Sequence, residues 1–314
     1  MTKKTEDTAT KDDKPSVSWQ AKFLREVTSW YIGFLDAETL DIENTRKRLD
    51  YYAGKVRTAS GVEVQQDEIA GLNAEWLTPR DAAEDKLLLY WHGGAYIVGS
   101  CASHRPCVSH IASESGIKAL VPEYRLAPEH PFPAAVEDSV AVYRALLEQG
   151  YDPANIVVAG DSAGGGLAVA MMLSLRHAGI PLPAAAGLLS PWLDLSGQGE
   201  SMETRRDQDP WFDPEHLPHI TKYYCDDTEL QNPLVSPVFA NVAGLPPTLI
   251  QVGDDELLLS DSERLAENLL AAGAGVEIDV WHGMWHVWQM FIGFMPESRA
   301  AVKKLGKFVH DSLQ

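Results

Sequence analysis

Short apolar runs alternate with amphipathic segments along most of the chain from residue 87 onward. Continuous apolar runs are typical of strands that are buried on both faces, whereas apolar residues at three- and four-residue spacing indicate helices. The runs predict strands at residues 87–92, 117–121, 156–160, 184–190, 248–252 and 276–281. The spaced pattern predicts helices at residues 132–150, 163–179, 260–272 and 297–312. Such alternation predicts an α/β protein with a parallel sheet and helices on both faces.

Two parts of the chain depart from this alternation. Residues 19–53 have apolar positions at helical spacing and no proline, so we expect them to be helical. Residues 62–69 and 73–78 are predicted to be exposed strands joined by a turn at Gly71. Residues 191–245 contain many prolines, charges and large aromatic residues between two buried strands. This segment is therefore expected to leave the sheet and, with the N-terminal helices, to form a lid over one edge of the core.

Composition and charge narrow the classes of protein to which the chain can belong. With 314 residues, of which 45% are hydrophobic and 23% charged, it has a globular composition and can bury a full-sized core. It has 45 acidic and 26 basic residues, a formal net charge of −19. Such a surface disfavours binding to nucleic acid or to anionic lipid.

The cysteines and the N-terminal residues bear on the cellular compartment. Three cysteines are an odd number and too few for a secreted disulfide scaffold. The first 18 residues contain four lysines and four acidic residues but no apolar run, so they are predicted to be a disordered leader rather than a signal peptide. No apolar stretch approaches the ~18 residues of a membrane span. We therefore expect a cytoplasmic protein without a membrane partner.

The pentapeptide Gly160-Asp161-Ser162-Ala163-Gly164 carries the most informative chemistry. It follows an apolar strand and opens a helix rich in Ala, Leu and Met, which is the context of a G-x-S-x-G nucleophile elbow. Small residues permit the tight turn that exposes such a serine, and the helix start presents N–H groups to a developing oxyanion. The alternative is a glycine-rich turn without a catalytic role, which the strand–turn–helix context disfavours. Ser162 is thus the candidate nucleophile.

A second glycine-containing turn follows an earlier strand. The pair Gly93-Gly94 comes directly after the apolar run at residues 87–92, and paired glycines let the backbone approach a ligand closely. Taken alone, such a turn is as often structural as functional. Because it precedes a serine elbow, the N–H groups of Gly93 and Gly94 are candidates, together with that of Ala163, for an oxyanion hole.

An activated serine requires a base, and the base requires a carboxylate that orients it. In this architecture the acid follows a late strand, where Asp254, Asp255 and Glu256 occur together. The base follows the next strand, where His282 and His286 both occur. His286 is preferred because it begins an aromatic-rich segment after a loop, whereas His282 adjoins the strand and is more simply a strand-end residue. Local sequence does not decide among the three acids, since a solvated acidic turn accounts for any two of them.

Cys101, His104, Cys107 and His110 form a run whose residue types suit a metal ion. On a helix, steps of three residues drift by about 60° each, so the four side chains spread over half of the circumference. They cannot all converge on one tetrahedral ion. We therefore predict a packed helix after the glycine turn and no metal site.

Several longer motifs occur together in one order. They are HGGAYIVGS at 92–100, YRLAPEHPFPAAVED at 124–138, GDSAGG at 160–165, SPWLDLS at 190–196 and GMWHVW at 283–288. With these motifs the chain resembles the bacterial hormone-sensitive-lipase-like esterases of the α/β-hydrolase fold, from about residue 20 to the end. The resemblance implies a mostly parallel central sheet flanked by helices, with a helical cap.

The same resemblance implies an activity and a set of residues. It implies a serine carboxylesterase without a cofactor that hydrolyses short- to medium-chain esters, with Ser162 as nucleophile and His286 as base. Part of the family takes its acid from a Glu, and the sequence ELL beginning at Glu256 resembles that branch. Glu256 is therefore favoured as the acid, with Asp255 in reserve. Family members often dimerise, so a homodimer is a further expectation.

The resemblance also assigns the oxyanion hole to Gly93, Gly94 and Ala163. The family's third glycine in the first of these loops is Ala95 here. A methyl group is tolerable there if Ala95 only supports the loop. It would trim the acyl or alcohol pocket if that backbone must contact the substrate.

Five segments follow from this comparison. They are a disordered leader at 1–18, the N-terminal part of the cap at 19–55, the first part of the catalytic core at 56–191, a cap insertion at 192–245 and the second part of the core at 246–314. A lactone hydrolase or an acyltransferase could use the same site, since an acyl-enzyme can meet other nucleophiles. A small-ligand receptor on an inactivated hydrolase fold is a rival of another class. The presence of serine, acid and histidine together disfavours it.

Overall fold

An eight-stranded sheet runs through the centre of the part of the chain that the computed structural model describes, residues 16–32, 41–226 and 229–314. Its strand order is β1-β2-β4-β3-β5-β6-β7-β8. The strands are β1 (Val62–Ile69), β2 (Leu72–Pro79), β3 (Ala83–Trp91), β4 (Ile117–Pro122), β5 (Ile156–Asp161), β6 (Ala185–Leu189), β7 (Thr248–Gly253) and β8 (Val276–Trp281). β3 to β8 are parallel, whereas β2 pairs antiparallel with both β1 and β4. The predicted mostly parallel sheet is confirmed.

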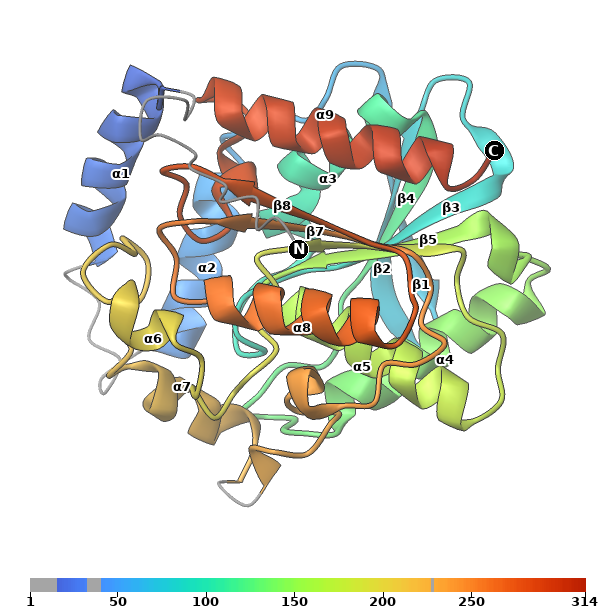
Figure 1. Cartoon of the computed structure of the whole chain (residues 1–314). Helices are drawn as coiled ribbons and strands as arrows, with labels where there is room; N and C mark the ends of the chain where they lie inside the picture. Colours follow the sequence, from blue (N-terminus) through green and yellow to red (C-terminus); the bar gives the residue numbers. More distant parts are fainter. Residues whose placement is uncertain (1–15, 33–40, 227–228) are drawn as a thin grey trace, which may run out of the picture.

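Helices cover both faces of this sheet (Figure 1). They are α1 (Trp19–Ile32), α2 (Ile42–Ala53), α3 (Cys101–Ser115), α4 (Ala134–Glu148), α5 (Ala163–His177), α6 (Ser201–Thr204), α7 (Leu217–Tyr224), α8 (Leu259–Ala271) and α9 (Pro296–Asp311). Short 3-10 helices lie at Pro153–Asn155, Pro237–Phe239 and Trp288–Phe291. α3 and α9 pack together on one face, and α4, α5 and α8 lie on the other. Every helix predicted from the apolar spacing is therefore present, with ends that differ by a few residues.

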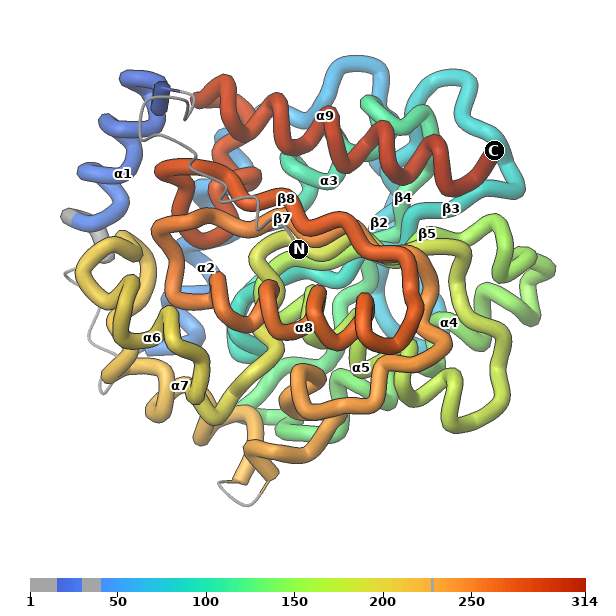
Figure 2. The backbone as a smooth tube through the Cα atoms, in the orientation of Figure 1, coloured from blue at the N-terminus to red at the C-terminus, as the bar shows by residue number. Residues whose placement is uncertain are grey.

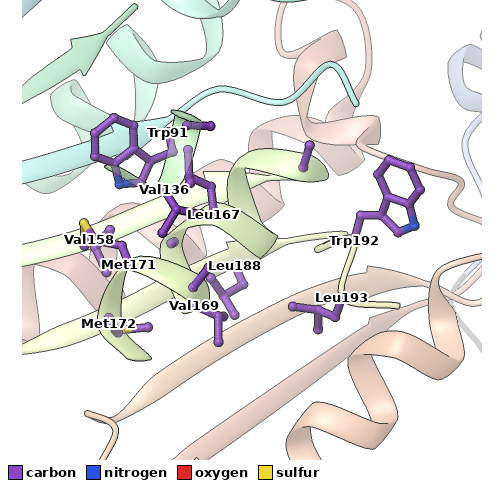
Figure 3. Packing of buried hydrophobic residues seen from close by; sticks show 14 of the residues in the cluster. Trp91, Val136, Val158, Leu167, Val169, Met171, Met172, Leu188, Trp192 and Leu193 are labelled. Atoms are coloured by element: carbon purple, nitrogen blue, oxygen red, sulfur yellow. The ribbon is translucent and has the colours of Figure 1, made fainter. Parts of the chain in front are cut away.

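Burial on both faces explains the unbroken apolar runs of the central strands. Leu87 to Trp91 of β3 are fully buried, because a helical layer covers each side of the strand. On one of these sides, Leu167 and Met171 of α5 pack with Val158 of β5 and Leu188 of β6 (Figure 3). α5 begins directly after Ser162, so this packing fixes the base of the serine turn on the middle of the sheet.

The second strand differs from the sequence prediction, which had both N-terminal strands exposed. β1 is largely exposed along its length and forms the edge of the sheet. β2 lies between β1 and β4, and its Ala74 and Leu77 are buried. The prediction was wrong for β2 because pairing with β4, some forty residues later in the chain, places it inside the sheet, where α3 packs against it.

The N-terminal segment is only partly within the described residues. Of the predicted helical stretch 19–53, α1 and α2 are present, and residues 33–40 lie outside the described residues. Of the predicted leader 1–18, residues 1–15 also lie outside them. Ser18 is placed, because its backbone N–H donates to Glu297 Oε1 at 2.7 Å and its hydroxyl donates to Glu297 Oε2 at 2.8 Å. The chain immediately before α1 is thus tied to α9.

α1, α2, α6 and α7 gather at one end of the sheet, on the left in Figures 1 and 2. α2 is attached to the core by Arg46, whose guanidinium donates to Ile97 O and Ala127 O, each at 2.8 Å. Arg46 also pairs with Glu129 at 2.8 Å, and this hydrogen-bonded pair lowers the pKa of Glu129 to about 2. These contacts hold α2 against the loops that follow β3 and β4. Within the described ranges, no helix combines the length and the apolar character needed to cross a bilayer.

Candidate active site

Ser162 lies at a sharp turn between β5 and α5. Its backbone has φ +51° and ψ −122°, and such a conformation costs a non-glycine residue about 1–3 kcal/mol. Hydrogen bonds hold the turn from both sides: the Ser162 N–H donates to Leu189 O, and the Trp192 N–H donates to Ser162 O, each at 2.9 Å. The strained turn keeps the serine at the end of the strand instead of in the first turn of the helix.

Close backbone contacts explain the glycines on either side of Ser162. A Cβ atom on Gly160 would lie 2.4 Å from Gly164 O, and a Cβ atom on Gly164 would lie 2.0 Å from Trp91 O. Both distances are far shorter than van der Waals contact, so any side chain at these positions would push β3, β5 and α5 apart. The G-x-S-x-G spacing is therefore a packing requirement of the elbow.

His286 and Glu256 lie behind Ser162 in one buried line. The distance from His286 Nε2 to Ser162 Oγ is 3.0 Å, and both residues are at most 5% exposed. On the other side of the ring, His286 Nδ1 lies 3.6 Å from Glu256 Oε2, an ion-pair distance rather than a hydrogen bond. Glu256 is fully buried. The structure thus brings together the three residues that the sequence proposed as nucleophile, base and acid.

A serine that the sequence analysis did not assign holds the carboxylate in place. The Ser190 hydroxyl donates to Glu256 Oε2 at 2.9 Å and accepts from the Val287 N–H at 3.2 Å. It therefore connects Glu256 to the residue that follows His286. Burial raises the pKa of Glu256, and its contacts with His286 and Ser190 oppose that rise. Ser190 begins the SPWLDLS motif, and that position was the available sign of its importance.

The three acids of the turn after β7 have three different partners. Asp254 Oδ2 lies 2.8 Å from His282 Nδ1, and that imidazole is more than a third exposed. Asp255 pairs with Arg25 of α1 at 2.5 Å. Of the three, only Glu256 faces His286, and this geometry distinguishes between acids that the local sequence left open.

The predicted oxyanion donors differ in their surroundings. The Gly93 N–H donates to Asp161 Oδ1 at 3.0 Å and to His104 Nε2 at 3.2 Å, so it is already engaged behind the turn. This arrangement does not support the predicted role of Gly93. Its N–H instead donates to the buried carboxylate of Asp161, which holds the glycine in place. Ala163 is the first residue of α5, where a backbone N–H has no acceptor within the helix. Gly94 has φ +117°, and a Cβ atom there would lie 2.2 Å from Val98 O. The roles of Gly94 and Ala163 stay predictions.

Ala95 occupies the position at which the family that the chain resembles has a third glycine. The backbone of Ala95 is in the left-handed region, with φ +53°. The next residue, Tyr96, has φ +62°. An alanine in this conformation is strained by its Cβ atom, whereas a glycine is not. The loop therefore accepts the alanine at an energetic cost in the backbone.

Comparison with known proteins identifies the family. The family model described as "alpha/beta hydrolase fold" matches residues 88–290. An acetyl-hydrolase of Streptomyces hygroscopicus is 46% identical over 237 residues, which are 75% of this chain and 79% of the relative. An esterase from the bacterial hormone-sensitive lipase (HSL) family superposes with a TM-score of 0.90 at 39% identity, covering 96% of this chain and 100% of the other. The chain belongs to the HSL family of α/β-hydrolases.

A second relative agrees with the activity of these proteins. An esterase of Acinetobacter venetianus is 37% identical over 248 residues, or 79% of this chain and 82% of the relative. The predicted α/β-hydrolase fold, the predicted family and the prediction of a carboxylic ester hydrolase are thereby confirmed.

An aromatic ring from the segment after β6 lies against the histidine of this HSL-family hydrolase. The Phe212 ring, from the segment between β6 and α7, lies 4.8 Å from the His286 ring, centroid to centroid. Tyr96 and Tyr224 stack with centroids 3.8 Å apart and ring planes within 7°. The segment after β6, which interrupts the strand–helix alternation, therefore places one aromatic ring against His286 and another against the loop after β3.

A second buried polar group in the HSL-family core lies directly behind the glycine turn. Asp161 accepts from the Tyr90 hydroxyl at 2.8 Å and lies 3.3 Å from His104 Nε2. Burial alone would raise the pKa of Asp161, but the adjacent His104 and the Tyr90 hydroxyl hold it below its ordinary value. Burial, together with the nearby His104, lowers the pKa of His92 to about 3. The second residue of the G-x-S-x-G motif thus anchors the turn that contains Gly93.

The cysteine–histidine run lies on α3, as predicted, and its side chains have separate partners. Cys101 Sγ donates to Val121 O at 2.8 Å, and Cys107 Sγ donates to Gln289 O at 3.6 Å. His104 faces Asp161, as described above. Burial lowers the pKa of the half-buried His110. These contacts fasten α3 to the sheet and to the segment after His286.

Proposed function

We propose that the protein is a serine carboxylesterase that hydrolyses short- to medium-chain carboxylic esters through an acyl-enzyme on Ser162. The observation that carries this proposal is the 3.0 Å distance between His286 Nε2 and Ser162 Oγ, with Glu256 on the far side of the same imidazole. A nucleophile in contact with a base, which in turn faces a buried carboxylate, is the arrangement that activates a serine.

In the first half-reaction, His286 Nε2 takes the hydroxyl proton as Ser162 Oγ attacks the ester carbonyl carbon. Glu256 stabilises the imidazolium that forms. Backbone N–H groups of Ala163 and Gly94 stabilise the oxyanion, each by about 3 kcal/mol. The imidazolium then gives its proton to the departing alcohol. In the second half-reaction, His286 takes a proton from water as the water oxygen attacks the acyl-enzyme. The imidazolium then returns a proton to Ser162 Oγ, which releases the acid and regenerates the serine.

The preference for short and medium acyl chains rests on two supports. A relative that is 46% identical is named an acetyl-hydrolase. In addition, the Phe212 ring lies 4.8 Å from the His286 ring, and a large ring at this place limits the space for a long acyl chain. We also propose that residues 19–55 and 192–245 form the cap. A homodimer and a cytoplasmic location stay predictions.

The test is hydrolysis of p-nitrophenyl esters from acetate to palmitate by the wild type and by Ser162→Ala. The proposal predicts the highest kcat/KM for acetate, butyrate or hexanoate and loss of that activity in Ser162→Ala. Equal hydrolysis by Ser162→Ala would contradict the mechanism, and a maximum at palmitate would contradict the proposed substrate range. Added methanol or a lactone substrate distinguishes acyl transfer and lactone hydrolysis by their products.

A further inference from the structure

Asp209, in the segment between α6 and α7, is a further buried carboxylate close to the proposed site. It is 9% exposed. Its Oδ1 accepts from the Trp211 N–H at 2.8 Å, and its Oδ2 accepts from the Leu257 N–H at 3.0 Å. These donors are 46 residues apart in the chain, so one side chain joins two separate segments.

Each of the two donors adjoins a residue that contacts His286. Leu257 directly follows Glu256, which faces His286 Nδ1 at 3.6 Å. Trp211 directly precedes Phe212, whose ring lies 4.8 Å from the His286 ring at an interplanar angle of 57°. Asp209 therefore holds the peptide next to the acid and the peptide next to the ring that covers the imidazole.

We propose that Asp209 is a positioning residue of the esterase, which aligns Glu256 and Phe212 on His286 and places a second negative charge near the imidazolium formed during catalysis. This inference rests on the proposed function, because it assigns Asp209 a part in the activation of Ser162. Since Asp209 does not touch the reacting atoms, its effect is on the geometry and charge around His286.

The charges around Asp209 define what its removal changes. Burial raises the pKa of Asp209, while the charge of His286 and the N–H groups of Leu257 and Trp211 oppose that rise. Arg25 donates to Gln208 O and pairs with Asp255, and Arg205 donates to Asp254 O at 2.7 Å. Glu256 and His286 interact electrostatically with Asp209. The other charged and titratable groups of the flanking segments are Arg25, Arg205, Asp254, Asp255 and His282. Of all these groups, His286 is the one whose protonation sets the acid limb of a serine esterase.

Asp209→Asn keeps the size of the side chain but removes its charge and one of its two accepting oxygens. One of the two backbone N–H groups then faces an amide NH2 and loses its acceptor. We expect kcat for p-nitrophenyl butyrate to fall by about 10- to 100-fold, since small misplacements of catalytic groups have effects of this size. KM is expected to change little. The acid limb of the pH profile of kcat/KM is expected to move to lower pH by about half a unit, since a nearby negative charge favours the imidazolium.

Asp213→Asn is the matched control in the same segment. Asp213 Oδ1 accepts from the Glu215 N–H at 2.9 Å, the same two-residue spacing as between Asp209 and Trp211, but Asp213 is exposed. We expect its kcat and pH profile to equal those of the wild type. A wild-type kcat and an unmoved acid limb in folded Asp209→Asn would overturn the proposal. A fall in kcat without a shift of the acid limb of the pH profile would overturn the proposed effect of the Asp209 charge on His286.

Phe212→Leu keeps the inference testable if Asp209→Asn does not fold. Loss of the ring is expected to lower kcat several-fold without moving the acid limb, because no charge is removed. An unchanged kcat would overturn positioning through Phe212. Failure of the proposed function is recognised separately, by hydrolysis that persists in Ser162→Ala. If that hydrolysis is lost and Asp209→Asn is unaffected, only the role of Asp209 is wrong.

Discussion

Replacing Glu256 with Gln removes one negative charge from a fully buried position and changes the size of the side chain very little. The carboxylate lies 3.6 Å from His286 Nδ1. At this separation and an effective dielectric constant of about 20, two unit charges attract each other by about 4–5 kcal/mol. In the catalytic cycle the imidazolium forms as Ser162 loses its proton, so this attraction stabilises the transition state more than the active resting enzyme. Its loss corresponds to a fall in kcat of roughly 10³-fold.

Asp255→Asn is the control for this substitution, because it removes the same charge one residue earlier. Asp255 pairs with Arg25 where both side chains are 26% exposed, and a pair of this kind contributes at most about 1 kcal/mol to stability. We therefore expect kcat of Asp255→Asn to stay within about threefold of the wild type, since it does not face His286. Steady-state hydrolysis of p-nitrophenyl butyrate measures both variants, with circular dichroism to confirm that each is folded.

The reasoning would be refuted in either of two ways. Folded Glu256→Gln that keeps more than about a tenth of the wild-type kcat would mean that the charge at 3.6 Å contributes far less than the Coulomb estimate. A loss in Asp255→Asn as large as that in Glu256→Gln would mean that the turn acts as a unit and that neither residue is individually the acid.

Three further predictions concern the same region and its surroundings. His286→Ala should lose nearly all kcat, whereas His282→Ala should keep it, because its imidazole pairs with Asp254; equal losses would leave the base misassigned. Ala95→Gly should raise the free energy of unfolding in urea by about 0.5 kcal/mol, since glycine adopts φ +53° without strain; a lower value would contradict this. Burial raises the pKa of Asp261 from 3.8 to about 8, so the folded protein binds this proton more tightly than the unfolded chain and loses stability as pH rises from about 4 to 8. Asp261→Asn should reduce that loss by about 1 kcal/mol per pH unit, and an unchanged slope between pH 5 and 8 would argue against it.

Features that depend on neighbouring residues could be predicted from the sequence. The buried strands β3 and β5 are continuous apolar runs, and the elbow at Ser162 follows from a strand, small residues and a helix in direct succession. The contacts of Gly160 and Gly164 show why no larger residue fits there. Local periodicity was enough for these features because each element is defined by its own side chains.

Features that depend on distant partners could not be predicted in the same way. Asp254, Asp255 and Glu256 are distinguished by their partners, which are His282, Arg25 and His286 in that order. Arg25 lies 230 residues away from Asp255 in the chain. The Gly93 N–H was assigned to an oxyanion, yet it donates to Asp161, 68 residues later. Burial of β2 depends on pairing with β4. In each case the deciding contact is made by tertiary packing, which residue spacing does not encode.

Covalent trapping of the nucleophile tests the central claim most directly. Incubation with diethyl p-nitrophenyl phosphate, followed by intact-mass and peptide mass spectrometry, reports which residue attacks an ester-like electrophile. The account predicts one diethylphosphoryl group per chain, located on Ser162, with complete loss of esterase activity and no labelling of Ser162→Ala. Labelling at another residue, or hydrolysis that continues after Ser162 is fully modified, would contradict the account.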